Sequence, residues 1–140
     1  MGVELIVIRQ NDDPEGSFGV DQSGHRVLAK YLDQLDELTR SLATKGFFAF
    51  FDVAGAEFEM FEEIHGEEPP ENWLEENRKW FSPAEAIVCC QQIIEILSQQ
   101  KPSFVEQDDF EVLVEDLNDC LRLLRTIERK NDLFCFSIII

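Results

Sequence analysis

The chain has 140 residues, of which 44% are hydrophobic and twelve are phenylalanine, so it is long and apolar enough to fold around one core. Its formal net charge is -17 and its isoelectric point is about 4.3, which disfavours binding to nucleic acid because phosphate contacts need clustered Lys and Arg. The same charge disfavours an anionic membrane surface and favours a basic protein, or a cation, as the partner. We therefore expect a single domain over residues 1–140.

The first ten residues predict a cytoplasmic location. Their apolar run, from Leu5 to Ile8, is too short for the hydrophobic region of a signal peptide or for a membrane span. Position 6 is Ile, where N-myristoylation requires Ser or Thr. In the absence of a secretion signal, we interpret the four cysteines as buried thiols and not as disulfides.

The N-terminal part of the chain predicts a strand, a loop and a helix. Residues 3–8 are apolar and β-branched, which favours a buried strand, and residues 10–24 have the Gly, Asp and Ser content of a loop. A helix is expected over residues 25–44, capped by Asp21 or Ser23 and ended by Lys45-Gly46. Its buried face is expected to carry Leu28, Tyr31, Leu32, Leu35, Leu38 and Leu42. Its solvent face is expected to carry Asp33, Asp36, Glu37 and Arg40.

The next segment is aromatic and then acidic. Residues 47–53 predict either a short strand or an aromatic plug beneath the helices, and the pattern leaves both open. From Gly46 to Asn77 the chain has ten acidic residues and neither Lys nor Arg, so this segment carries -10 of the net charge of -17. Pro69-Pro70 interrupts any helix here and predicts an exposed, extended turn.

The clearest helix signal in the chain follows at Trp80–Leu97. Ser82 stands at the N-cap, Pro83 at the first helical position and Glu85 three residues after the cap, which predicts a capping box. The apolar residues that follow recur at helical spacing and form a wide stripe, typical of a central helix that is covered on more than one side. These residues are Ala86, Ile87, Cys89, Cys90, Ile93, Ile94 and Leu97.

A second long helix is predicted over residues 108–130, with acidic residues early and basic residues late, as the helix dipole favours. Its apolar face consists of Phe110, Leu113, Val114, Leu117, Cys120, Leu121, Leu124 and Ile127. Residues 133–140 are again β-branched and aromatic, and their natural partner is the N-terminal strand, since a lone strand leaves its backbone groups unpaired. The predicted fold class is α+β, with about three main helices packed on a small sheet that includes the N- and C-terminal strands.

No catalytic or cofactor motif emerges from the sequence. Glu62 and His65 have the Glu-x-x-His spacing of di-iron bundles, but a second such motif is missing, so we interpret them as surface residues of a short acidic helix. Cys89-Cys90, Cys120 and Cys135 lack the paired spacing of zinc ligands. Neither the nucleophile motif Gly-x-Ser-x-Gly nor a dinucleotide or phosphate loop occurs. We therefore expect no catalytic residue, no metal and no cofactor.

The stretch from Glu57 to Ile64 interleaves carboxylates with large apolar groups, and it has two interpretations. In the first, Phe58, Phe61 and Ile64 are the inward side of a short amphipathic helix whose glutamates face water. In the second, aromatic anchors ringed by carboxylates form a surface that attracts a basic partner. The candidate residues of that surface are Glu57, Glu59, Glu62, Glu63, Glu67, Glu68, Phe58, Phe61 and Trp73.

The C-terminal half resembles a set of small, acidic, uncharacterised bacterial proteins. The resemblance is carried by Trp80-Phe81-Ser82-Pro83-Ala84-Glu85, which matches their Trp-Phe-Ser/Asp-Pro-x-Glu helix start, and by the order of the elements that follow. It implies a cytosolic single domain and no known activity. Some small acidic bacterial proteins of this general build act as immunity or antitoxin-like partners, which is an analogy of fold and charge only.

Three functional hypotheses follow from the sequence. The first is a non-enzymatic interaction protein that uses the segment from Asp52 to Glu76 to bind a basic protein, for example a toxin or nuclease that it neutralises. The second is a small hydrolase or metal-dependent enzyme built on carboxylates and His65. The third is a homodimer or larger homo-oligomer joined through the terminal strands.

Overall fold

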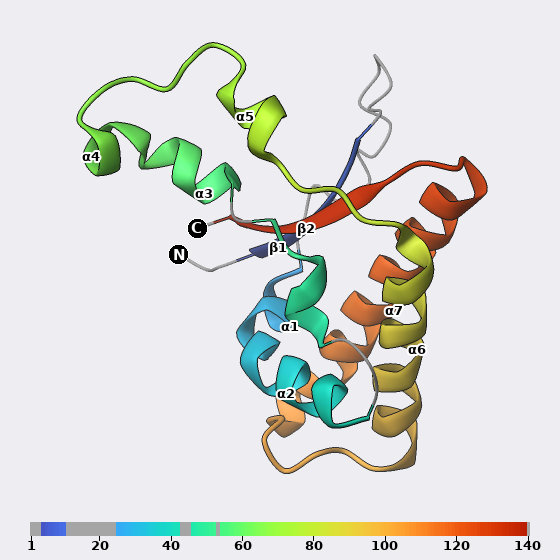
Figure 1. Ribbon diagram of the computed structural model, residues 1–140. Coiled ribbons are helices and arrows are strands. Elements are labelled where there is room, and N and C mark those ends of the chain that lie inside the picture. The colour runs from blue at the N-terminus through green and yellow to red at the C-terminus, as the bar shows by residue number, and fades with distance from the viewer. Residues whose placement is uncertain (1–3, 11–24, 43–45, 53, 140) are drawn as a thin grey trace.

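The two ends of the chain meet in an antiparallel sheet on which the long helices pack (Figure 1). The computed structural model describes residues 4–10, 25–42, 46–52 and 54–139. β1 (Glu4–Arg9) pairs with β2 (Phe134–Ile139) along its whole length, from Glu4 opposite Ile139 to Arg9 opposite Phe134. The longest helices, α6 (Pro83–Gln99) and α7 (Gln107–Arg129), pack against each other. The α+β fold class and the pairing of the terminal strands are confirmed.

The third long helix is α2 (Leu32–Leu42), in agreement with the prediction of about three main helices. The remaining helices of the described residues are short: α1 (Arg26–Lys30), the 3-10 helix η2 (Phe47–Phe50), α3 (Ala54–Glu59), α4 (Phe61–His65) and α5 (Trp73–Asn77). In Figure 1, α1, α2 and η2 lie with α6 and α7 on one side of the sheet, and α3, α4 and α5 extend away from them.

β2 is the central strand of the molecule because other segments pair with both of its edges. Phe134, Cys135, Phe136 and Ser137 are all buried. On the edge away from β1, Phe134 exchanges two backbone hydrogen bonds with Phe81, at 2.8 and 2.9 Å, and Phe136 accepts one from Asp52 N–H at 3.0 Å. At these residues, this edge of β2 is therefore already paired within the chain. An oligomer joined through the terminal strands would need some of the same backbone groups.

The aromatic run at residues 47–53 is a plug, not a strand. Phe47 and Phe50 in η2 are buried beneath the sheet, where Phe47 stacks on Phe136 with ring centroids 5.2 Å apart. Phe51 then contributes a single bridge to Phe136 of β2. The described residues of the run thus form the plug, with one isolated bridge to the sheet, and residue 53 lies outside the described residues.

The helix predicted over residues 25–44 is broken, and the prediction of one continuous element is wrong. α1 ends at Lys30 with Tyr31 as its C-cap, and α2 begins at Leu32 and extends to Leu42. Residues 43–45 and the proposed caps Asp21 and Ser23 lie outside the described residues. The break is held by tertiary hydrogen bonds to α7 and to the turn before it. Tyr31 Oη donates to Asp109 Oδ2 at 2.6 Å and accepts from the backbone N–H of Glu106 at 3.1 Å. Contacts 75 and more residues away thus override the local periodicity.

Asp36 was expected on the solvent face of this helix, and it is buried. Its carboxylate accepts hydrogen bonds from the N–H of Phe48 at 2.8 Å and pairs with Arg40 Nε at 2.9 Å, so it anchors η2 to α2. The role predicted for Gly46 also differs. Its φ is -77°, so it is not a left-handed cap. A side chain at this position would instead collide with Asp36 and Arg40, which explains why the position favours glycine.

The two long helices agree with the prediction, except at the start of α6. The predicted apolar residues of α6 are buried apart from Ile94, which is half-buried. On α7, Phe110 and Val114 are half-buried, and Leu123 is a buried residue that the pattern missed. Ser82 is the N-cap and Pro83 the first helical residue as predicted, but Ser82 makes no side-chain capping bond, so the capping-box prediction is wrong in that respect. The neighbouring Phe81–Phe134 bridge fixes the entry of the chain into α6.

A buried histidine joins β1, α1 and α7. His25 is 2% exposed, and its Nδ1 lies 3.0 Å from the carbonyl oxygen of Leu5 while its Nε2 lies 2.8 Å from Asp119 Oδ2. Each ring nitrogen thus lies within hydrogen-bond distance of an oxygen, and the ring links β1 to α7. Burial alone raises the pKa of Asp119, but the hydrogen bonds from His25 and Arg122 outweigh it and leave that pKa lowered.

We expect His25→Ala to lower the free energy of unfolding by about 2–3 kcal/mol, since it removes a buried ring and the two hydrogen bonds through which that ring joins Leu5 of β1 to Asp119 of α7. Urea denaturation measures this loss, and Gln91→Ala, at an exposed position on α6, is the control with an expected change below about 0.5 kcal/mol. The pKa of Asp119 is lower in the folded protein than its unfolded value of 3.8. The ionised Asp119 therefore stabilises the fold above pH 3.8, and this stabilisation is lost as the pH falls below that value. Equal stabilities of the two variants would contradict this account of His25.

Candidate functional site

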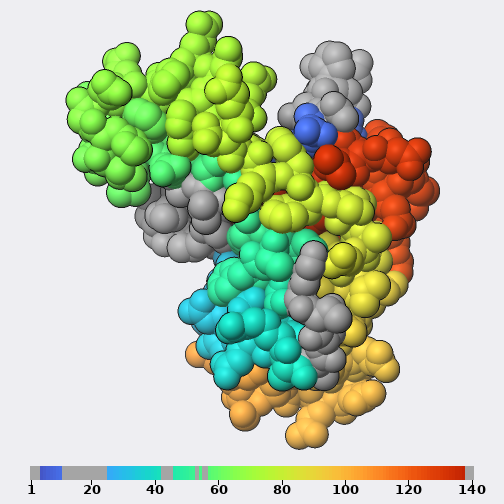
Figure 2. Space-filling model, in the orientation of Figure 1, coloured from blue at the N-terminus to red at the C-terminus, as the bar shows by residue number. Residues whose placement is uncertain are grey.

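Residues 54–77 form a projection that we call the acidic arm. It contains α3, α4, α5 and their connections, and in Figure 2 it is the green and yellow-green lobe that stands away from the body of the molecule. The arm contains nine glutamates and neither Lys nor Arg, so its formal charge is -9. It is therefore the most strongly charged surface feature in the described part of the chain.

A small aromatic cluster holds the arm together from within. Phe61 is 6% exposed, and its ring lies 5.2 Å from that of Trp73 and 4.3 Å from that of His65. Trp73 is half-buried and also stacks on Phe58, with centroids 6.3 Å apart. Through these contacts α3 and α4 pack against α5. Two of the candidate surface aromatics, Phe61 and Trp73, thus form the inner support of the arm.

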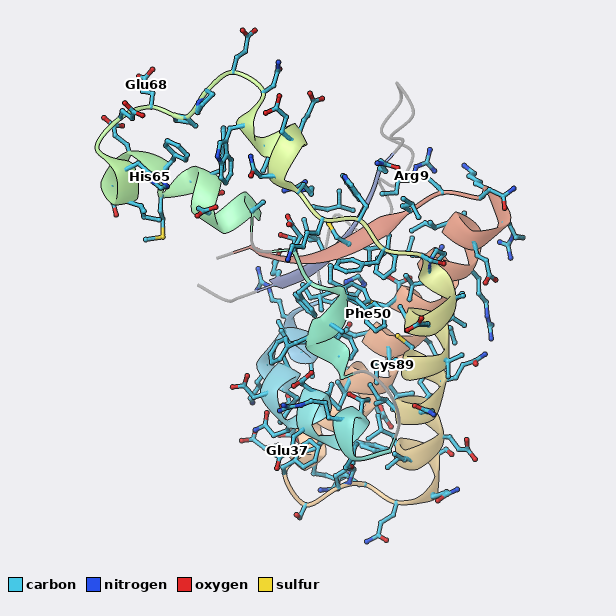
Figure 3. The ribbon with its side chains drawn as sticks, viewed as in Figure 1. Arg9, Glu37, Phe50, His65, Glu68 and Cys89 are labelled. Atoms are coloured by element: carbon cyan, nitrogen blue, oxygen red, sulfur yellow. The ribbon has the colours of Figure 1, made fainter. Side chains whose placement is uncertain are left out.

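The outer surface of the arm combines carboxylates with exposed apolar groups. Five candidate glutamates are exposed, namely Glu59, Glu62, Glu63, Glu67 and Glu68, and Glu57 is half-buried. Beside them Phe58, Met60 and Ile64 are 37%, 49% and 54% exposed. Figure 3 shows His65 and Glu68 at the outer end of the arm, far from Phe50 and Cys89 in the body.

This exposure corrects the first interpretation of the stretch from Glu57 to Ile64, because of its three inward residues only Phe61 is buried. The cause is a break between α3 and α4 at Met60, which has φ -102° and ψ 11°. An unbroken helix would carry residues 58, 61 and 64 near one face, whereas the break turns Ile64 away from Phe61. Gly66, with φ 76°, then ends α4, and the chain continues through the Pro69-Pro70 connection without helix or strand.

The base of the arm is organised by Asp52, a residue that no sequence pattern distinguishes from the other acidic residues. Its side chain is 1% exposed and its Oδ2 lies 3.0 Å from Arg78 Nε. Its Oδ1 accepts hydrogen bonds from Ala54 N–H at 3.2 Å and from Lys79 N–H at 3.1 Å. Asp52 therefore contacts both the first residue of the arm and the residues directly after it. The partner residues are 26 and 27 positions away, so no local pattern reveals them.

The residues proposed for metal chemistry do not converge. Glu62 and His65 are both exposed on α4, and the side of His65 that is covered faces the ring of Phe61. Over the described residues, no group of three or more His, Cys, Asp or Glu side chains is placed to hold a metal ion. Over the same residues, none of the helices combines the length and the apolar character needed to cross a membrane.

The four cysteines are buried, free thiols, as predicted. Burial raises the pKa of Cys89 to about 11 and that of Cys135 to about 12, and it raises the pKa of Cys90 further. The thiolate is the reactive form, so these side chains are protected both by burial and by protonation at neutral pH.

We expect the folded protein at pH 8 to react with a thiol reagent at least about a hundredfold more slowly than free cysteine, and all four thiols to react after unfolding in urea. In the folded protein Cys89, Cys90 and Cys135 keep their protons above pH 9, the ordinary pKa of the thiol, while the same thiols lose theirs in the unfolded chain. Stability should therefore fall as the pH rises above 9. Rapid labelling of any cysteine in the folded protein would contradict this.

In comparisons with known proteins, no family model, curated protein or solved structure matches this chain.

Proposed function

We propose that this protein is a non-enzymatic interaction module that binds a basic protein through its acidic arm. The observation that carries the proposal is the placement of Phe58, Met60 and Ile64, all exposed, among exposed glutamates on a projecting element with no cation of its own. Apolar groups inside a ring of like charge are the usual composition of a surface that buries a few anchors and selects its partner by charge.

The charge of the arm supports long-range attraction of a basic partner. At physiological ionic strength the screening length is about 8 Å, so clustered carboxylates on one lobe act together on an approaching surface. The partner that this chemistry fits presents Lys and Arg around a small apolar depression. A nuclease or toxin whose basic surface normally contacts phosphate is one protein class with that property, and the arm would cover that surface.

The proposal is tested by capture from an extract of the native cell. The immobilised chain is exposed to extract at low salt and eluted with rising salt, and we expect a basic protein to elute in the salt steps. An identical column carrying an unrelated acidic protein of similar charge identifies proteins retained by charge alone. If folded chain retains no basic protein beyond that control, the proposal is wrong.

The apolar residues of the arm should contribute to the lifetime of the complex. We expect Met60→Ser combined with Ile64→Ser to accelerate dissociation by about tenfold, since apolar anchors act mainly on the dissociation rate. The salt dependence of the affinity should stay unchanged because no charge is altered. Surface plasmon resonance with the protein eluted from the wild-type column measures both. Val88→Ser, at a 51% exposed position on α6, is the control and should leave dissociation unchanged.

A further inference from the structure

We propose that Asp52 is the positioning residue of the acidic arm: it fastens both ends of the arm to each other and to β2, and so fixes the direction in which the arm faces its partner. The role in binding a partner rests on the proposed function. The set of contacts around Asp52, which we call the clamp, is established by the structure of the chain alone.

The carboxylate of Asp52 joins the two ends of the arm, and its backbone N–H joins them to β2. Oδ1 binds the N–H of Ala54, at the start of α3, and the N–H of Lys79, just after α5. Oδ2 pairs with Arg78 at 3.0 Å. The backbone N–H of Asp52 donates to Phe136 O of β2 at 3.0 Å, which ties the whole group to the central strand. A carboxylate that accepts three hydrogen bonds in a water-poor site is held in one geometry.

Arg78 is well placed to transmit this restraint to the arm. Its backbone N–H donates to Leu74 O at 3.0 Å and closes the last turn of α5, so the residue directly after the arm both caps α5 and binds Asp52. Its guanidinium group also lies 6.0 Å from the ring centroid of Trp80, and its side chain is only 16% exposed. A substitution of Arg78 is therefore expected to change the orientation of α5 more than the packing of the body.

The arm needs such a clamp because it has little other attachment. Its helices contact one another, and its aromatic cluster of Phe58, Phe61 and Trp73 is internal to it. An internally packed lobe joined to the body through its two ends can swing as a unit unless those ends are fixed. Fixing them beforehand removes an ordering cost from binding, since a surface with one orientation loses less freedom when it is occupied.

The partner-free test measures distances between spin labels. One pair joins arm and body, at Ile64→Cys and Val112→Cys, and a control pair lies within the body, at Val88→Cys and Val112→Cys; all three positions are exposed. The native cysteines are buried, so the introduced thiols are the ones labelled. We expect Arg78→Gln to broaden the arm–body distance distribution at least about twofold, and Arg78→Lys, which keeps the charge, to restore much of the narrow distribution. The body pair should not change in either variant.

Asp52→Asn is the second variant, and it should broaden the same pair because the amide cannot bind Arg78 as a carboxylate does. The clamp is overturned if the arm–body distribution stays narrow in both Arg78→Gln and Asp52→Asn, or if the body pair broadens equally, which would mean general loss of packing. A second experiment measures binding, with the basic protein that was eluted from the column carrying the wild-type chain. With Arg78→Gln it should elute at lower salt, and Arg78→Lys should restore the wild-type elution.

The two proposals fail in different ways. If the column carrying the wild-type chain retains no basic protein, the proposed function is overturned, and with it the role of Asp52 in binding. The distances between the spin labels still show whether the clamp exists. Retention that is identical for wild type and Arg78→Gln, with a broadened arm in the variant, overturns the positioning role and leaves the interaction module intact.

Discussion

Reversing four glutamates of the arm, in the variant Glu62→Lys, Glu63→Lys, Glu67→Lys and Glu68→Lys, should weaken binding of the basic partner by at least about a hundredfold at physiological salt. The four side chains are exposed on α4 and in the connection after it. Each one would turn from attraction to repulsion toward a basic surface, and a change of about 1 kcal/mol at each position is enough for this effect. Isothermal titration with the protein eluted from the wild-type column measures it.

A matched variant separates the arm from the total charge. Glu95→Lys, Glu111→Lys, Glu115→Lys and Glu128→Lys change four exposed glutamates of α6 and α7. Both variants change the net charge by +8, from -17 to -9. If binding depends on the arm, the body variant should lose less than about tenfold. Equal losses in the two variants would show that overall charge governs binding and would refute the assignment of the arm.

Replacing Phe136 by Ala should lower the free energy of unfolding by about 3–5 kcal/mol, the largest stability effect that we expect from one substitution. Phe136 is 1% exposed in the central strand. Its ring lies 5.2 Å from Phe47, 5.3 Å from Phe51 and 5.1 Å from Phe134. The substitution removes the ring on which the aromatic plug rests and leaves a cavity between the sheet and η2.

Equilibrium denaturation in urea measures this loss. The control is the same substitution, Phe to Ala, at an exposed position. Phe48 is 40% exposed, and Phe48→Ala should lower the free energy of unfolding by about 1 kcal/mol or less. A similar loss for the two variants would mean that the packing of the plug beneath β2 does not determine stability.

The sequence predicted the elements whose periodicity is long and whose ends carry signals. α6 and α7 have apolar residues at helical spacing over several turns, and the terminal strands are short β-branched runs that need partners. The break at Tyr31 and the burial of Asp36 were not predictable, because both depend on hydrogen bonds to residues far along the chain or in a different element. Local pattern carries no information on such contacts.

The candidate site was predicted in composition but not in geometry. The charge of residues 46–77 is visible in the sequence, as is the interleaving of Glu with apolar residues. The exposure of Ile64 follows from a helix break that no Pro or Gly marks, so the pattern could not predict it. Asp52 was counted as one acidic residue among ten, and only the fold reveals that it is buried at the base of the arm.

The most direct test of the central claim is a hydrogen-exchange map of the wild-type chain with and without the basic protein recovered by capture. The account predicts that amide protection gained on binding is concentrated in residues 54–77, on α3, α4 and the connection to α5, with little change along α6 and α7. Protection confined to the long helices or to the sheet, with the arm exchanging as in the free protein, would contradict the claim that the acidic arm is the binding surface.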